Sequence, residues 1–459
     1  MSPNAVLRVD RLDLRNFRCF AECTIELHPQ LTVLVAENGR GKTALLDVIG
    51  IALGTFVDAL TGLQYFHKFA RSDVRLIQGE NRAMQPVLPT EFVADGYVSG
   101  QPIRWSRALT GDSRRSRTTR KDAESLCKAA KKFRGSVEDN VVKGNGNQPI
   151  LPLVAFYGTG RLWSEHRLTE GKRTNVVAAI GRTSGYTDCL SSSSSFKGMV
   201  AWYENKWNET HDPRYSTELS KTLPLLTAVQ KATRVVLEPT GWCELDWDFE
   251  KKSLVVGHRD YGRLPLSALS DGVRNMIALI ADIARRCATL NPHLNEDAAQ
   301  LTPGVLLIDE VDMHLHPRWQ QLIVQLLRNA FPALQMILTT HSPHVLSTVD
   351  AGSIRVIRLS DGRGVLEIPA FQTRGVESAD ILAKVMDVDP VPQVEQARWL
   401  SDYRAFVQTG EHESPAARSL WERLVAHFGK EHPVLAEVET LRRLQEFKRT
   451  NKLPLQGST

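Results

Sequence analysis

The sequence predicts an α/β fold with a helical C-terminal region. Near the N-terminus, the apolar run Leu31–Val35 leads through a glycine-containing turn into the apolar stretch 44–54, a strand–turn–helix pattern. Two later apolar runs, 304–308 and 336–338, each end in polar residues, as parallel strands do where they meet a ligand. From about residue 376, apolar residues recur at helical spacing. Together these patterns predict a mixed sheet flanked by helices, followed by helices alone.

The strand–turn–helix unit contains the run Ala36-Glu-Asn-Gly-Arg-Gly-Lys-Thr43. It matches the phosphate-loop pattern G-x-x-x-x-G-K-[ST], except that the first glycine is alanine. In such a loop, backbone N–H groups and the positive end of the helix surround an anion. The lysine adds a charge for the β- and γ-phosphates, and the threonine hydroxyl is a Mg²⁺ ligand. We therefore expect a nucleotide site built from Asn38, Gly39, Gly41, Lys42 and Thr43.

Bulk properties bound the class of protein. A chain of 459 residues is long enough for two or three domains, and its net charge of +5 is a mild basic excess. The six cysteines lack C-x-x-C or C-x-x-H spacing, which argues against a structural zinc site and for reduced thiols. The N-terminus lacks the features of a signal peptide, and no apolar stretch was expected to reach the ~18 residues of a membrane span. We expect a soluble, cytoplasmic protein without membrane contact.

A strongly basic stretch runs from Arg104 to Arg134, with eleven Lys or Arg residues against three Asp or Glu. One interpretation is a solvated insertion. The other is a contact with the phosphate backbone of DNA or RNA, which would be independent of base sequence and sensitive to salt. Aromatic residues are nearly absent from the stretch, so stacking on bases is not indicated. Both interpretations remain open for the basic insertion 111–145.

The middle of the chain reads as a strand followed by a largely helical insertion. The buried strand 150–157 ends in Gly158-Thr-Gly-Arg161, a loop whose arginine is a candidate either for sensing the γ-phosphate or for a structural ion pair. Residues 165–240 are expected to be mostly helical, with helices at 196–207 and 223–236. A hairpin is expected from the alternation around 245–249 and the apolar run 254–256.

Three later elements add candidates for the nucleotide site. Ser270 and Gly272 open an apolar helix, where free amides form an anion site, although such a cap is weak evidence by itself. The strand 304–308 ends in Asp309 and Glu310, the acid pair that Mg²⁺-dependent hydrolysis requires. His341 follows the next strand and is placed to contact a γ-phosphate. The nearby His-x-His of residues 314–316 has no third ligand in sequence, so a metal site is not expected there.

The order of these motifs resembles an ABC-type ATPase head of the SMC/RecF/OLD group. Transporter subunits place the Leu-Ser-x-Gly signature nearer to the phosphate loop, whereas Leu269 lies 226 positions after Thr43 here. The stretches 155–161, 185–190 and 378–390 further resemble PtuA-type ATPases of Septu and retron-associated anti-phage systems. The resemblance implies an ABC-type P-loop ATPase head, a mixed sheet flanked by helices, with a helical insertion and a helical C-terminal region.

The resemblance also implies roles for individual residues. Arg18 and the loop Asn38, Gly39, Arg40, Gly41, Lys42 and Thr43 would bind ATP, while Thr43 and Asp309 would bind Mg²⁺. The catalytic residues would be Lys42, Glu310 as general base and His341 as switch histidine. Ser270 and Gly272 would reach the ATP of a second protomer, which implies head-to-head dimers within a homo-oligomer. No glutamine of a Q-loop is evident, and Gly158–Arg161 is its expected substitute.

For partners, the resemblance implies an HNH nuclease of the PtuB kind, with a reverse transcriptase and its DNA product in retron-associated systems. The alternatives are a RecF/SMC-like DNA repair ATPase, a nucleotide-gated scaffold without turnover, and an OLD-like nuclease that would use Asp387 and Asp389. The expected organisation is an ATPase lobe (1–110), the basic insertion (111–145), the rest of the lobe with its helical insertion (146–260), the motif-bearing core (261–370) and a helical partner-docking region (376–459).

Overall fold

The computed structural model describes residues 6–62, 69–79, 82–111, 121–143, 148–161, 181–191, 196–211 and 219–450. Most of the arginine-rich run 114–121 and the Ser192–Ser195 run lie outside these residues, as do parts of the expected helical insertion. The chain forms two compact units, Met1–Met386 and Asp387–Thr459.

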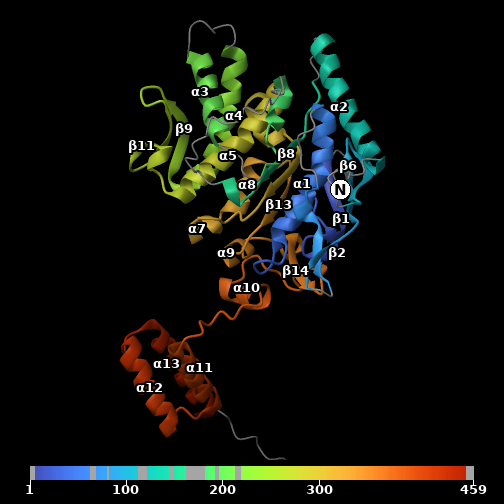
Figure 1. The fold of residues 1–459 in the computed structure, drawn as a ribbon. Helices are drawn as coiled ribbons and strands as arrows, with labels where there is room; N and C mark the ends of the chain where they lie inside the picture. The colour runs from blue at the N-terminus through green and yellow to red at the C-terminus, as the bar shows by residue number, and fades with distance from the viewer. Residues whose placement is uncertain are drawn as a thin grey trace, which may run out of the picture. The chain divides into compact units, whose positions relative to one another are not determined.

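The first unit is built on a ten-stranded mixed sheet (Figure 1). From one edge to the other, its strands are β7 (Gln101–Leu109), β6 (Thr90–Val98), β1 (Leu7–Phe17), β2 (Phe20–Glu26), β15 (Arg363–Glu367), β14 (Ile354–Ser360), β3 (Leu31–Val35), β13 (Leu334–Thr339), β12 (Gly304–Ile308) and β8 (Leu153–Tyr157). The five strands from β14 to β8 run parallel, and β7, β6, β1 and β2 pair antiparallel. This is the mixed sheet expected of an ABC-type P-loop ATPase head, so the predicted fold class is confirmed.

The parallel strands form the core of the unit. Every residue of β3, β8, β12 and β13 is buried, which explains why these strands read as continuous apolar runs rather than as alternating ones. Because they are parallel, their carboxyl ends meet at one edge of the sheet, where open α/β sheets bind ligands. The strand that leads into the phosphate loop, β3, lies between β14 and β13, and β12 lies next to β13.

The long helix α1 (Lys42–Thr61) packs against this core. By length and composition it is apolar enough to span a membrane, contrary to the expectation that no such stretch exists, but 78% of its most apolar window is buried inside the unit. The helix is therefore accounted for as a core element. The second long helix, α2 (Glu124–Lys143), lies alongside it, with Phe133 packed edge-on against Phe56 (Figure 1).

The insertion between β8 and the signature motif contains the predicted helices and hairpin. Helices α3 (Phe196–His211) and α4 (Leu219–Leu237) are slightly longer than expected. The hairpin of β9 (Trp242–Asp248) and β10 (Ser253–His258) is present, and β11 (Gly262–Pro265) extends it to three strands. This small sheet adjoins α3 and α4 at one end of the unit (Figure 1).

The remaining elements of the first unit are mostly short. Helix α5 (Asp271–Leu290) carries the signature motif at its start. The others are β4 (Arg75–Gln78), β5 (Met84–Val87), α6 (Ala298–Leu301), α7 (Pro317–Gln320), α8 (Ile323–Ala330), α9 (Pro343–Leu346) and α10 (Ser378–Lys384). Helix α10 was grouped with the C-terminal region from sequence, but Ile381 and Val385 are buried in the core of the first unit.

The second unit is a three-helix bundle of α11 (Glu395–Thr409), α12 (Pro415–Phe428) and α13 (Pro433–Thr450). Its own core contains Tyr403, Val407, Leu424, Leu435 and Val438, which come from all three helices. The apolar residues predicted at helical spacing thus form the inside of this bundle.

Candidate nucleotide site

The loop between β3 and α1 has the backbone that the phosphate-loop pattern requires. Gly39 and Gly41 adopt left-handed conformations, with φ of 76° and 93°. A Cβ atom on Gly41 would lie 2.4 Å from the ring of Phe20 and 2.7 Å from Cys19 Sγ, so this position accepts only glycine without rearrangement. Residues 37–40 are exposed at the tip of the loop. An anion therefore has access to the amides at the start of α1.

Lys42 is buried beneath this loop. Its Nζ donates to the carbonyl oxygens of Ala36 (2.8 Å) and Glu37 (3.1 Å). Burial lowers the pKa of Lys42, and the carboxylates of Asp309, Glu310 and Asp312 oppose that effect. The ammonium thus already lies within the loop that would wrap a phosphate chain.

The candidate Mg²⁺ ligands are in direct contact. Thr43 Oγ1, at the start of α1, donates to Asp309 Oδ2 over 2.8 Å, although the residues are 266 positions apart. The other carboxylate oxygen, Oδ1, accepts from Thr339 Oγ1 over 2.6 Å. Asp309 is only 2% exposed. A hydroxyl and a buried carboxylate are the hard oxygen donors that Mg²⁺ prefers, so the residues present fit this ion.

Glu310 has an unusual backbone for its residue type. Its φ is +47°, and a non-glycine residue in this region costs about 1–3 kcal/mol. The conformation is held from β13, because the Glu310 N–H donates to Thr339 Oγ1 over 2.7 Å. Thr339 therefore fixes both members of the acid pair. The sequence motifs do not mark Thr339, and its place at the end of the strand before His341 is the signal that could have identified it.

His341 lies at the carboxyl end of β13, half-buried. Burial lowers its pKa from the ordinary value, and the ammonium of Lys42 lowers it further, against the opposing effect of Glu310, Asp312 and Asp309. The imidazole is therefore neutral near pH 7. The structure brings Lys42, Thr43, Asp309, Glu310 and His341 together at one edge of the sheet.

The signature residues lie at the start of α5. Ser270 occupies the N-cap position, yet its exposed side chain makes no capping hydrogen bond. Gly272 packs so closely on the loop after β12 that a Cβ atom would lie 2.3 Å from the carbonyl oxygen of His314. Of the His-x-His pair, His316 caps α7, with its Nδ1 accepting from the N–H of Arg318. The loop and α5 are locked together.

Arg18 is engaged in ion pairs. It lies in the turn between β1 and β2, with Nη1 2.5 Å from Asp47 Oδ2 in α1 and Nη2 2.8 Å from Asp73 Oδ1. Its guanidinium is thereby held beside α1. Whether Arg18 contacts ATP stays a prediction. Arg40 likewise pairs with Glu37, at 3.1 Å, on the exposed loop.

The basic stretch and the loop after β8 lie only partly within the described residues. Within the basic stretch, Lys128, Lys131 and Lys132 are exposed on α2, and Lys128 pairs with Glu124 at 2.9 Å. The loop Thr159–Arg161 forms a single 3₁₀ turn after β8, and the side chain of Arg161 lies outside the described residues. Its role as a γ-phosphate sensor or as an ion-pair partner stays open.

The acid pair of the nuclease alternative follows α10 in irregular chain. Asp389 Oδ1 accepts from the N–H of Val391, two residues later. Neither Asp387 nor Asp389 ends a strand. Among the described residues, no group of three or more His, Cys, Asp or Glu side chains is arranged to hold a metal ion at this or another place.

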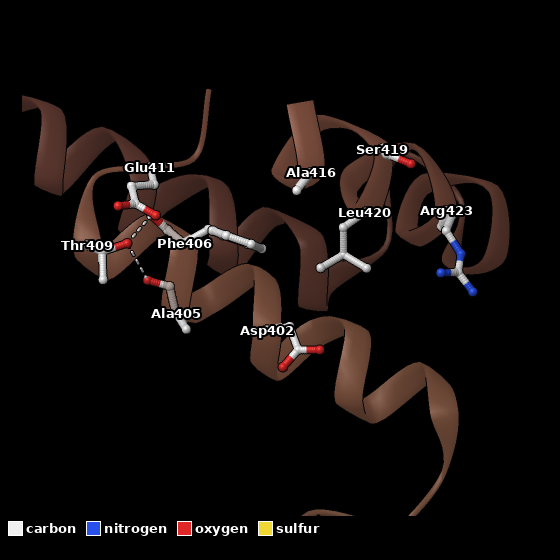
Figure 2. Close-up of a pocket in the computed structure, with 9 residues that line it drawn as sticks. All are labelled: Asp402, Ala405, Phe406, Thr409, Glu411, Ala416, Ser419, Leu420 and Arg423. Atoms are coloured by element: carbon white, nitrogen blue, oxygen red, sulfur yellow. Dashed lines mark hydrogen bonds between the residues drawn. The ribbon is translucent and has the colours of Figure 1, made fainter. Parts of the chain in front are cut away.

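The C-terminal bundle contains an open groove of about 510 Å³ between α11 and α12. Figure 2 shows the side chains of Phe406 and Leu420 pointing toward one another across it. Asp402, Glu411 and Arg423 supply charges along its walls. None of the predicted nucleotide-site residues lines this groove.

Two family models match parts of this chain. One matching family model is described as an AAA domain, putative AbiEii toxin, type IV TA system, and covers residues 210–347. Another, described as an AAA domain, covers residues 11–212.

Two curated relatives match over most of the chain, and a third matches over about a fifth of it. The retron Ec83 probable ATPase of Escherichia coli is 36% identical over an alignment of 488 positions, which covers 94% of this chain and 86% of the relative. The retron Vc95 probable ATPase of Vibrio cholerae serotype O1 biovar El Tor is 26% identical over 89% of this chain and 85% of the relative. The Septu protein PtuA of Bacillus mycoides is 44% identical over 98 residues, 21% of this chain and 13% of the relative.

Among solved structures, one similar fold is an Smc head bound to the C-winged helix domain of ScpA. The alignment covers 78% of this chain and 97% of the Smc head chain, at 13% identity and a TM-score of 0.47.

Proposed function

Because the chain belongs to the family of retron-associated, PtuA-type ATPases of the SMC/RecF group, we propose that it clamps Mg²⁺-ATP between two head-to-head copies and thereby regulates a separate HNH nuclease in anti-phage defence. The observation that carries the ATP part is the carboxylate of Asp309, which joins Thr43 of the phosphate loop to Thr339 beside Glu310. The family's members are named as probable ATPases, and this chain is an ATPase of that family.

The residues divide the chemistry among them. Mg²⁺, when bound, neutralises charge on the β- and γ-phosphates, and Thr43 and Asp309 would hold it. Lys42 gives up its two loop carbonyls for phosphate oxygens, which are stronger acceptors for an ammonium. Glu310, aimed by Thr339, orients the attacking water and accepts its proton. His341, neutral at pH 7, donates one hydrogen bond toward the γ-phosphate.

Dimerisation supplies the other side of the nucleotide. The free side chain of Ser270 and the first amides of the 20-residue helix α5 form an anion site that its own chain does not satisfy with a capping side chain. We assign this site to the γ-phosphate bound by a second copy. Two ATP molecules would then join two heads, and hydrolysis would release them.

The partner assignments rest on the family and on the bundle. The second unit has its own core, so it is suited to present a docking surface for a nuclease. The exposed lysines of α2 suit a nucleic acid backbone, such as the DNA product of a reverse transcriptase. We place the assembly in the cytoplasm.

The test uses the tagged protein expressed from its native operon, with and without ATP. Glu310→Gln should trap ATP and yield stable dimers or larger oligomers by light scattering, while Lys42→Ala should not. Co-purification of an HNH protein whose DNA cleavage changes with ATP supports the defence assignment. Dimerisation on ATP with capture of only repair factors and DNA would instead favour a RecF/SMC-like repair ATPase and overturn it.

A further inference from the structure

Tyr157, the last residue of β8, connects two parts of the ATPase that act on different nucleotides. Its carbonyl oxygen accepts from the N–H of Asp309 over 2.8 Å. Its hydroxyl donates to Asp282 Oδ2, in the middle of α5, over 2.7 Å. Tyr157 is 1% exposed and Asp282 is 4% exposed. One buried residue thus bonds with its backbone to the strand end that carries the Mg²⁺ carboxylate and with its side chain to the helix that carries the signature motif.

Asp282 is held as a charged group inside the protein. Burial disfavours its ionised form, but Arg285 and Arg286 outweigh burial and keep the pKa of Asp282 well below its ordinary value. Arg285 Nη2 donates to Oδ1 over 2.7 Å, and Arg286 Nε donates to Oδ2 over 2.9 Å. Arg286 Nη1 also donates to the carbonyls of Gly185 and Thr187, each over 2.9 Å. Because desolvating such groups is expensive, a buried ionic network is a poor device for stability and a better one for geometry.

A second attachment makes this geometry definite. Ten residues before Asp282, Gly272 packs against the carbonyl of His314 in the loop after β12. At 1.5 Å rise per residue, the two attachments are about 15 Å apart along one helix. Contacts at two such points restrict the tilt of α5, and both join it to the strand ends beside Asp309, which links the position of Ser270 to that of Asp309 in the same chain.

We propose that Tyr157 and Asp282 are positioning residues. They make the position of the signature motif, which each copy presents to the ATP of its partner, depend on the position of that copy's own Mg²⁺ ligand Asp309. This inference rests on the head-to-head dimer of the proposed function. Removing the hydroxyl of Tyr157 breaks the bond between the end of β8 and the middle of α5 while Lys42, Thr43 and Asp309 keep their contacts. Nucleotide binding by the altered chain should persist, and turnover at the partner's site should fall.

Tyr157→Phe has a matched control in Tyr186→Phe. Tyr186 is also buried, and its hydroxyl donates to the carbonyl of Pro152 over 2.6 Å. The backbone of its neighbours Gly185 and Thr187 accepts from Arg286, but the hydroxyl of Tyr186 takes no part in the bonds to Asp282. Both variants lose one buried hydroxyl hydrogen bond. We expect Tyr157→Phe to bind a fluorescent ATP analogue as the wild type does but to hydrolyse ATP about tenfold more slowly, whereas Tyr186→Phe should retain turnover.

Mixed dimers separate the two sites. Chains carrying Lys42→Ala are added in excess before ATP, so that they pair with chains that have an intact phosphate loop. In such a mixed dimer, the site that binds ATP combines the intact loop of one chain with the signature motif of the Lys42→Ala chain. Tyr157→Phe placed in the Lys42→Ala chain should lower turnover about tenfold, and the same change in the loop-intact chain should not.

A fall only when Tyr157→Phe is in the loop-intact chain would show that Tyr157 serves its own Asp309, and it would overturn the inference. Equal turnover for Tyr157→Phe and Tyr186→Phe in a dimerising wild-type background would overturn it as well, leaving the proposed function intact. A wild-type protein that fails to dimerise with ATP would refute the proposed function, and this inference with it.

Discussion

Replacing Gly272 by alanine tests whether the signature helix must pack on the loop after β12. The new Cβ would lie 2.3 Å from the carbonyl oxygen of His314 and 3.2 Å from its carbon. Ordinary contacts begin near 3.4 Å, and the obstacle is backbone rather than the end of a flexible side chain. The first turn of α5 must therefore retreat by about 1 Å, which carries Ser270 with it.

The expected consequence is specific to hydrolysis. A displacement of about 1 Å at a positioning element costs on the order of a hundredfold in rate. Binding of ATP to the altered chain's own phosphate loop should change little, because Lys42 and Thr43 make none of the contacts in question. Stability should not fall by the full strain, since alanine is favoured over glycine in a helix by about 1 kcal/mol.

The assay is steady-state phosphate release at saturating ATP, beside a binding titration with a fluorescent analogue. Gly198→Ala in α3 is the matched control, because a Cβ there has nothing within 4 Å and the helix gain is the same. A Gly272→Ala protein whose turnover stays within about threefold of the wild type would refute the reasoning, since the clash would then have been absorbed without displacing the signature.

Three further predictions concern the phosphate loop, the acid pair and the buried network. Gly41→Ala should abolish ATP binding, because its Cβ would lie 2.4 Å from Phe20. In Gly39→Ala, the Cβ would have nothing within 4 Å, so this variant should bear only the left-handed backbone cost of about 1 kcal/mol and keep measurable affinity in the same titration. Thr339→Val should leave the N–H of Glu310 without its acceptor, lowering phosphate release about tenfold or more while ATP still binds; unchanged release would contradict that role. Because the pKa of Asp282 is depressed, its contribution to stability is present above its ordinary pKa of 3.8 and is lost as pH falls below that value. Asp282→Asn should therefore flatten the pH dependence of the urea-unfolding free energy below about pH 4. An identical pH dependence in the variant and the wild type would count against the ionic network.

The site was largely predictable because its residues follow short apolar strands. Asp309, Glu310 and His341 each stand just after such a run, Lys42 and Thr43 follow one through the phosphate loop, and parallel strands bring their carboxyl ends to one edge. The sequence therefore predicts which residues meet, even though Thr43 and Asp309 are 266 positions apart. The apolar helices of the C-terminal bundle were predictable from spacing for a similar reason.

The contacts that hold the site in place were not predictable. The hydrogen bond from Tyr157 to Asp282 spans 125 positions and joins the end of a strand to the middle of a helix. The hydrophobic periodicity of the sequence marks neither residue. Gly272 reads as an ordinary helix-start glycine until the loop carbonyl against it is known. Strand β11 lacks a continuous apolar run and forms only because β10 offers it a paired edge. In each case the determining partner is distant in sequence, so local pattern carries no information about it.

The charges around the site give a physical reason for two copies to cooperate. ATP carries more negative charge than one Mg²⁺ cancels, and this site adds the carboxylates of Asp309, Glu310 and Asp312 against the single ammonium of Lys42. Arg18 and Arg40, the nearby guanidiniums, are already paired with carboxylates of their own. The amides at the start of α5 in a second copy would add positive potential of the required sign at the γ-phosphate. We therefore expect turnover per chain to rise with protein concentration, because an isolated copy lacks the group that would stabilise the developing charge.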